Sequence, residues 1–282
     1  MSPRPRVLMV PPTYYGIEYE INPWMDRRQP ADTAAAQRQW DGLRSVLVDR
    51  LGAEVCLAEP QRGCPDMVFT ANAGIVLGDQ AVLSRFRHAE RQGEEPHFAA
   101  WFAAHGYNVQ RLPDEIAFEG EGDALFVGDT LLAGYLYRSE VRGHQRVGEL
   151  LGVRTLSLEL TDPRFYHLDT CFCPLDGQTA AYFPGAFDEY ARRVLATEVP
   201  LLVAVVEEEA VRFACNAVVL GRHVALNTGC PNLEADLRTL GFTPHATPLD
   251  EFLKAGGSAK CLTLHLDRQL VRCLDGGVPE VP

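Results

Sequence analysis

A weak internal repeat constrains the fold of this chain more than any other sequence feature. Four helix-like stretches end in a glycine followed by a strand-like run, at Gly52, Gly106, Gly152 and Gly241. A fifth junction of this kind, at 198–203, lacks the glycine. Glycine suits the position after a helix because the backbone there often turns left-handed, which disfavours a Cβ. The junctions recur at intervals of roughly 50 residues, and such a period is typical of circular or solenoidal arrays of similar units.

Each unit is predicted to contain a hairpin, a helix and a further strand. Two short strands with a glycine-containing turn are indicated at 73–83, 124–133 and 217–226. Helices are predicted at 34–51, 96–105, 138–151, 185–198, 231–240 and 248–255, with Pro184, Pro231 and Pro248 in first turns. Five such ββαβ units can close into an α/β ring with strands inside and helices outside. No linker-like segment divides the chain, so residues 1–282 are predicted to form one catalytic domain.

Charge and composition narrow the classes of partner. With 26 basic and 38 acidic residues, the net charge of −12 disfavours binding to nucleic acid or to anionic membrane surfaces. The 46% of hydrophobic residues can build a sizeable core. No apolar run is long enough for a signal peptide core or a membrane span, so a cytoplasmic protein is predicted. The expected partner is a small-molecule substrate, and the oligomeric state, homo-oligomer included, stays open.

The cysteines do not indicate a metal site. Most of the eight lie among apolar neighbours, as reduced buried thiols do. The chain has no CxxC pair and no HExxH motif, so zinc is not expected. Cys171 and Cys173 could be read as a ligand pair, but alternation along a strand is the favoured interpretation.

Polar residues recur about thirteen to twenty residues after each junction, in otherwise apolar or small-residue surroundings. Ring closure would bring these positions to a common centre. An interior lined by acid, amide, imidazole and thiol groups is costly unless the groups are paired or bind a ligand, so a substrate cavity is predicted. The residues are Asp66 and Asn72, Glu119 and Asp123, His167 and Asp169, Asn216, and Cys261.

Cys261 is the predicted nucleophile. It follows Gly256 and Gly257, which permit a sharp turn that could bring backbone N–H groups close to the site. A thiol reacts as its thiolate, and a bound cation or a protonated His167 would favour ionisation. The alternative is a buried core cysteine at the start of a strand.

His167 and Glu119 are the predicted catalytic partners of the thiol. His167 and Asp169 would point to the same face of a strand, so Asp169 could orient the imidazole or hold the substrate. The acidic run 118–123 lacks the ligand spacing of a Ca²⁺ loop. A carboxylate pair that clamps a planar guanidinium fits it better, with a solvated turn as the alternative.

Residue type alone suggests three further ligand contacts. Arg91 and Arg138 could bind a substrate carboxylate, and Asn22 could belong to a flap over the cavity. Surface solvation is the alternative for both arginines.

With these residues in view, nearly the whole chain resembles the amidinotransferase or guanidino-group-modifying superfamily, whose fold is the five-bladed α/β propeller called pentein. The resemblance is to its arginine dihydrolase branch and to dimethylarginine dimethylaminohydrolases. The motifs that carry it are Tyr14-Tyr15, 21–25 (INPWM), 66–74 (DMVFTANAG), 118–120 (FEG), 167–169 (HLD), and Gly256-Gly257 with Cys261.

The resemblance implies a role for each site residue. Cys261 would attack the guanidinium carbon, and His167 would protonate the departing amine and then activate water. Glu119, Asp66 and Asn72 would hold the guanidinium. Asn22, Arg91 and Arg138 would contact the amino-acid end, and neither metal nor organic cofactor would be needed.

One departure bears on the product. Deiminases of the superfamily typically have a second aspartate where this chain has Asn72. The resemblance therefore implies hydrolysis past citrulline to ornithine, carbon dioxide and two ammonia molecules. Two alternatives stay open: a hydrolase of arginine or methylated arginine that stops at citrulline, and a non-catalytic propeller that binds a partner.

Overall fold

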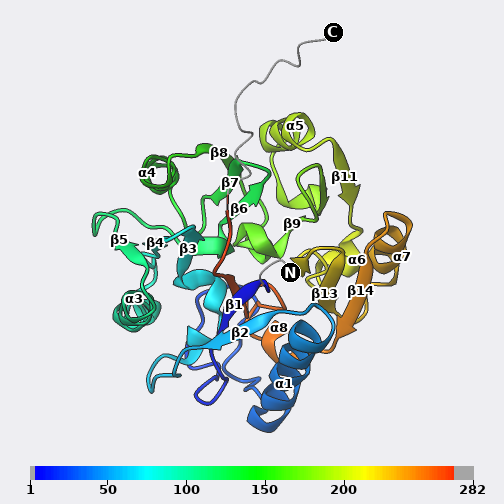
Figure 1. The fold of residues 1–282 in the computed structure, drawn as a ribbon. Coiled ribbons are helices and arrows are strands. Elements are labelled where there is room, and N and C mark those ends of the chain that lie inside the picture. Colours follow the sequence, from blue (N-terminus) through cyan, green and yellow to red (C-terminus); the bar gives the residue numbers. More distant parts are fainter. Residues whose placement is uncertain (1–3, 270–282) are drawn as a thin grey trace.

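A computed structural model describes residues 4–269 of the chain, and these residues form a ring of five three-stranded sheets with helices around the outside (Figure 1). This arrangement confirms the predicted propeller. The blades, with strands in sheet order, are β15 (Leu264–His265), β1 (Arg6–Met9) and β2 (Glu54–Leu57); β3 (Gly74–Leu77), β4 (Gln80–Leu83) and β5 (Asn108–Gln110); β6 (Ala124–Val127), β7 (Thr130–Tyr135) and β8 (Arg154–Glu159); β9 (Phe172–Pro174), β10 (Thr179–Tyr182) and β11 (Leu201–Ala204); and β12 (Val218–Leu220), β13 (His223–Asn227) and β14 (Thr243–Thr247).

Every blade has the same topology. Its first two strands pair antiparallel, as in the β3–β4 hairpin, where Gly74 pairs with Leu83. Its second and third strands pair parallel, as in β4–β5, where Gln80 pairs with Asn108. A parallel pair needs a crossover connection, which a helix supplies in each blade. The helices are α1 (Thr33–Asp49), α2 (Ala89–Gln92), α3 (Glu95–Ala104), α4 (Val141–Leu151), α5 (Glu189–Glu198), α6 (Glu207–Ala210), α7 (Pro231–Thr239) and α8 (Asp250–Leu253).

The first blade joins segments from opposite ends of the described chain. Val7 of β1 pairs with His265 of β15, and the Leu266 N–H donates to the Arg6 carbonyl at 2.9 Å. This pairing closes the ring, because it brings the segment that follows Cys261 beside the first strand. The position of Cys261 therefore depends on contacts between residues more than 250 positions apart in sequence.

The crossover helices bury one face against the sheets. In α1, Ala36, Trp40, Leu43 and Leu47 are buried, with the three- and four-residue spacing of a helix face. Burial stabilises the fold by about 1.5–3 kcal/mol for each large apolar side chain. None of the helices in the described part of the chain is both long and apolar enough to cross a membrane.

The glycine pattern predicts the ends of the crossover helices correctly. Gly52, Gly106, Gly152 and Gly241 all have φ between 66° and 83°. The three predicted hairpins are also confirmed.

Two predicted helix starts are wrong. Pro184 begins the 3₁₀ helix η6 (Pro184–Ala186), and α5 starts only at Glu189, where the Asp188 side chain accepts from the Ala191 N–H at 2.7 Å. Helix α8 starts at Asp250, after Pro248. At α5 the side-chain cap fixes the start, because it satisfies a free N–H of the first turn.

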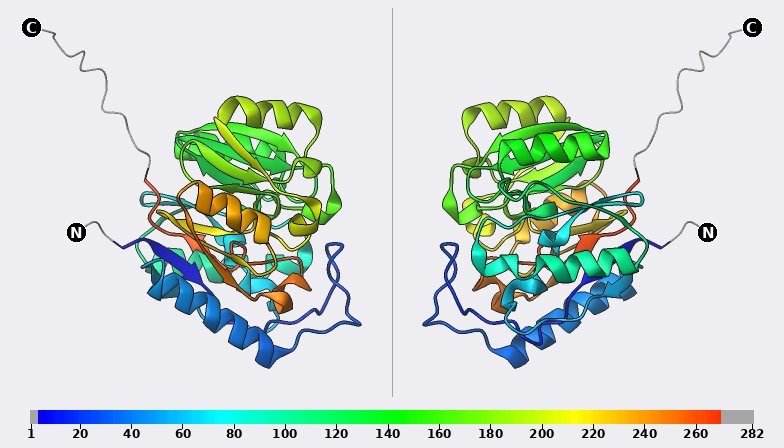
Figure 2. Two further views of the ribbon diagram at one scale, coloured as in Figure 1. Left: turned by 90° about the vertical axis from the view of Figure 1, so that its right-hand side faces the viewer. Right: turned by 90° about the vertical axis from the view of Figure 1, so that its left-hand side faces the viewer.

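The loop between β1 and α1 projects from one face of the ring (Figure 2). Two long-range bonds tie it to other blades. Tyr15 donates its hydroxyl to the Glu251 carbonyl at 2.8 Å, and the Trp24 indole N–H donates to the Arg164 carbonyl at 2.7 Å. These anchors place Ile21 and Asn22 over the ring centre, where the predicted site residues meet.

Candidate active site

The predicted site residues meet in one small cavity of about 260 Å³ beneath the loop. Seven of the nine line it directly: Asn22, Asp66, Asn72, Arg91, Arg138, His167 and Cys261. The other two lie directly behind, because Glu119 bonds to His167 and Asp169 contacts Cys261. Ring closure thus brings all nine together.

Short turns at the ring centre position these groups. The 3₁₀ helices η1 (Pro65–Val68), η2 (Thr70–Ala73), η3 (Gly120–Gly122) and η5 (Leu168–Thr170) precede the first strands of three blades. A further short helix, η4 (Pro163–Phe165), precedes η5. The polar side chains therefore sit at matching points of successive blades, as the repeat predicts.

Cys261 is a buried thiol with two polar partners. Its Sγ lies 3.3 Å from Asp169 Oδ2 and accepts from Asn216 Nδ2 at 3.1 Å. The backbone N–H of Cys261 donates to Asn216 Oδ1 at 3.1 Å, so Asn216 holds the nucleophile at two points. The sulfur opens into the cavity and is not enclosed by hydrocarbon, as a core cysteine would be.

The electrostatics of the thiol favour a cationic ligand. Burial, and then the negative charge of Asp169, raise the pKa of Cys261 well above its ordinary value. Burial likewise raises the pKa of Asp169 to about 7, although Lys260 opposes the shift. A bound cation would relieve both penalties, because it stabilises thiolate and carboxylate together.

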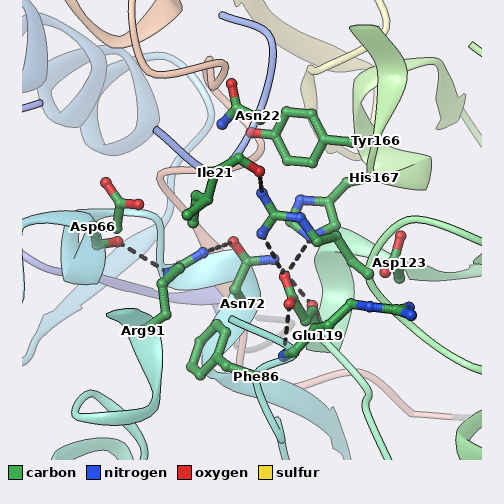
Figure 3. Close-up of polar contacts among 12 residues, drawn as sticks. Ile21, Asn22, Asp66, Asn72, Phe86, Arg91, Glu119, Asp123, Tyr166 and His167 are labelled. Atoms are coloured by element: carbon green, nitrogen blue, oxygen red, sulfur yellow. Dashed lines mark hydrogen bonds and ion pairs between the residues drawn. The ribbon is translucent and has the colours of Figure 1, made fainter. Parts of the chain in front are cut away.

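His167 and Glu119 form the second half of the site (Figure 3). The imidazole Nε2 lies 2.7 Å from Glu119 Oε2, which also accepts from Arg138 Nη1 at 3.2 Å. Burial alone would raise the pKa of Glu119, but Arg138 and His167 outweigh it and hold that pKa well below its usual range. Burial lowers the pKa of His167 to about 4. Glu119 is therefore ionised beside a neutral imidazole at neutral pH.

The structure corrects the expected relation between His167 and Asp169. The two do not alternate along a strand, since His167 precedes η5 and Asp169 lies within it. Asp169 consequently points to Cys261 and not to the imidazole. Asp123 is also unavailable as half of a carboxylate clamp, because its oxygens accept from the Ser139 hydroxyl and the Leu168 N–H.

The loop residues close the cavity from above. Asn22 Nδ2 donates to the Ala255 carbonyl at 3.0 Å, and its Oδ1 accepts from the Trp24 N–H at 2.9 Å. Arg138 Nη2 donates to the Ile21 carbonyl at 2.9 Å. Arg138 therefore joins the loop to Glu119, the carboxylate that holds His167.

The opposite wall contains Asp66, Asn72 and Arg91. Arg91 Nη1 donates to Asn72 Oδ1 at 2.8 Å, and its Nη2 donates to the Asp66 carbonyl at 3.1 Å (Figure 3). Asp66 Oδ1 is buried and has no hydrogen-bond partner. A carboxylate oxygen left in this way beside the cavity is ready to accept from a ligand N–H.

A second cavity, of about 440 Å³, lies near the same axis and is lined by none of the nine predicted residues. Glu121 and Lys260, which form a buried ion pair at 2.7 Å, belong to its wall. The residues with nucleophile and acid–base chemistry line the smaller cavity, so we place the candidate active site there.

Comparison with known proteins identifies the family. Residues 20–268 match the family described as N,N dimethylarginine dimethylhydrolase, eukaryotic. A dimethylarginine dimethylaminohydrolase from Mycobacterium tuberculosis is 44% identical, over 93% of this chain and 85% of that protein. The chain belongs to this family.

Other relatives of the dimethylarginine hydrolase family are arginine dihydrolases. The bifunctional arginine dihydrolase/ornithine cyclodeaminase AgrE of Nostoc sp. is 49% identical over 94% of this chain. This chain spans only 38% of the length of AgrE. The crystal structure of the N-terminal domain of the cyanobacterial arginine dihydrolase ArgZ, bound to product, superposes with a TM-score of 0.92 at 47% identity, covering 95% of this chain and 99% of that domain. The predicted superfamily is thereby confirmed.

Sequence reasoning omitted Asn216 from the site of this family member, although its place in the repeat had singled it out. The structure gives it two contacts with Cys261. Tyr166 was also missed: its hydroxyl donates to the Gly256 carbonyl at 2.7 Å, and its ring lies 4.6 Å from the Arg138 guanidinium carbon. Its position next to His167 was the available signal.

The buried environment predicts that Cys261 is a neutral thiol in the free protein. The thiolate absorbance of the protein minus that of a Cys261→Ser variant should be negligible at about pH 8 and rise only well into the alkaline range. The physical reason is the raised pKa, which lowers the thiolate fraction at any given pH. A difference signal that titrates near pH 7 would contradict this expectation.

Proposed function

We propose that this chain is an arginine dihydrolase, which converts L-arginine and two water molecules into ornithine, carbon dioxide and two ammonia molecules. The observation that carries the proposal is the pairing of a nucleophile with an acid–base group in one closed, acid-lined cavity. Cys261 contacts Asp169 and Asn216, and His167 contacts Glu119, at the wall of the same cavity.

The first half of the reaction uses the guanidinium group. Its positive charge would offset the burial of Asp169 and favour the Cys261 thiolate. The sulfur would attack the guanidinium carbon, and the tetrahedral adduct would expel ammonia after His167 has delivered a proton. The product of this step is an S-alkylthiouronium on Cys261. Water activated by His167 would then release citrulline and restore the thiol.

Glu119 is expected to support both proton transfers. Its carboxylate orients the imidazole through Nε2 and stabilises the imidazolium formed when His167 takes a proton. Its other oxygen, Oε1, accepts from the Arg87 N–H at 3.2 Å, which limits its own movement.

The second half of the reaction requires a site that also accepts a neutral ureido group. Asn72 offers an uncharged amide at the cavity wall, where a second carboxylate would favour cations alone. The strong similarity to AgrE and ArgZ over more than 90% of this chain supports the same conclusion. Attack of the thiolate on the ureido carbon would expel the second ammonia, and hydrolysis would give ornithine and carbon dioxide.

One citrulline-forming alternative has specific support, since the matched family is described by dimethylarginine hydrolysis. A non-catalytic propeller is less well supported, because thiol and imidazole line one cavity. The cytoplasmic location and a homo-oligomeric state remain predictions, as does the single domain over residues 1–282.

Counting ammonia tests the proposed function. Purified protein supplied with limiting arginine should release two equivalents of ammonia per arginine, and ornithine should account for the amino-acid product. One equivalent with citrulline would indicate a deiminase. Release of dimethylamine from dimethylarginine, faster than ammonia from arginine, would favour the dimethylarginine reaction.

A further inference from the structure

The Asn72 amide is held in one orientation by two partners of opposite kind. Its Nδ2 donates to the Glu119 carbonyl at 3.0 Å, and its Oδ1 accepts from Arg91 Nη1 at 2.8 Å. The reversed amide would place an oxygen against the carbonyl and an NH₂ against the guanidinium, so both bonds would become repulsive. Asn72 is 2% exposed, and water cannot easily compensate for that loss.

Arg91 cannot move freely, because four of its five N–H groups are engaged. Nε and Nη2 donate to the two carboxylate oxygens of Glu94, both at 2.8 Å. Nη2 also donates to the Asp66 carbonyl, and Nη1 to Asn72. The guanidinium carbon lies 4.4 Å from the centre of the Phe86 ring. Arg91 is therefore fixed as a support for Asn72 and has one N–H left for a ligand.

Glu94 is the group that fixes Arg91. It has no exposed surface, and both side-chain oxygens accept from Arg91. A bidentate pair of this kind sets the plane and direction of the guanidinium, which a single contact does not. Glu94 does not line the cavity, so any effect on the reaction must pass through Arg91.

Gly122 restrains Asn72 from a second side. A Cβ built on Gly122 would lie 2.1 Å from Asn72 Nδ2 and 3.5 Å from His167 Cγ. Its φ is not left-handed, so close approach of the amide explains the glycine at this position. Any side chain there would displace the amide, because a contact of 2.1 Å is impossible.

The held orientation leaves a useful pair of groups on Asn72. One N–H on Nδ2 and one lone pair on Oδ1 stay uncommitted by these bonds. A guanidinium offers only donors, whereas the ureido group of citrulline also presents an oxygen acceptor. The charged group is attracted to the acidic cavity in either case, but the neutral one depends on correctly placed hydrogen bonds.

We propose that Glu94 and Gly122 are positioning residues that hold the Asn72 amide in this orientation and so determine whether hydrolysis continues from citrulline to ornithine. The inference rests on the proposed two-step function. Disturbing the amide should slow the second step more than the first, because the second lacks the attraction between unlike charges.

The test compares the product ratio of Glu94→Gln and Gly122→Ala with that of the unmodified protein. We expect the second step to slow by about 10- to 100-fold and the first by much less, so citrulline should accumulate. Glu209→Gln is the matched control, since Glu209 is a buried glutamate of another blade that accepts from the Asn232 and Leu233 N–H groups. Its product ratio should stay that of the unmodified protein.

A double variant tests whether Glu94 acts through the amide. Glu94→Gln combined with Asn72→Ala should give the same product ratio as Asn72→Ala alone. Equal slowing of both steps, with an unchanged ratio, would overturn the inference and leave Glu94 as a general stabiliser. If Glu94→Gln does not fold, Gly122→Ala decides the matter by the same ratio. An unmodified protein that stops at citrulline would instead refute the proposed function itself, before any variant is compared.

Discussion

Replacing Cys261 with serine is expected to lower arginine hydrolysis by roughly 10⁴-fold or more, because the covalent step loses its nucleophile. Serine is nearly isosteric, and its hydroxyl can keep the contacts with Asp169 and Asn216. The fold and substrate binding should therefore survive. Mass spectrometry of protein quenched with excess arginine should show a covalent adduct on the unmodified chain and none on the variant.

A second buried cysteine provides the control for this substitution. Cys230 is fully buried at the start of α7 and does not line the cavity, so Cys230→Ser should keep near-normal turnover. An adduct that persists in Cys261→Ser, or turnover within tenfold of the unmodified chain, would show that another group is the nucleophile.

Replacing His167 with asparagine is expected to cost roughly 10²- to 10⁴-fold in turnover, the usual contribution of a positioned acid–base group. The amide of asparagine can still donate toward Glu119 but cannot exchange protons near neutral pH. If His167 activates water, the thiouronium adduct should also persist longer on Cys261 once formed. Steady-state rates and quenched-flow mass spectrometry would measure the two effects.

His144 is the matched histidine for this experiment. It is 1% exposed, burial lowers its pKa to about 4 as it does for His167, and its Nδ1 lies 2.9 Å from Ser157 Oγ, away from the cavity. His144→Asn should lower thermal stability without a comparable loss of turnover per folded molecule. Equal losses in the two variants would argue that His167 has only a structural role.

The local pattern of the chain predicts most of the fold. Glycines such as Gly152 mark helix ends because the left-handed conformation is a property of a single residue. Hairpins such as 124–133 are encoded by a few adjacent residues. The start of α5 was misplaced because a proline allows a helix to begin without specifying which side chain caps it.

The candidate site is predicted less completely, since its contacts join distant segments. The repeat brings Asp66, His167 and Cys261 to one centre, as the cavity bears out. It does not reveal which partner each group takes: Asp169 reaches the thiol because η5 turns it away from the imidazole. Glu94 gave no sequence signal at all, since a buried glutamate next to a short helix looks like a surface residue.

The sequence by itself determined the number and type of the repeated units and the chemical groups that each contributes to the centre. Only the tertiary structure decided how those groups pair, as in Asn216 with Cys261 and Arg91 with Glu94 and Asn72. The physical reason is range. Backbone preferences act over a few residues, whereas these bonds form only after five blades close into a ring and bury polar groups that must then find partners.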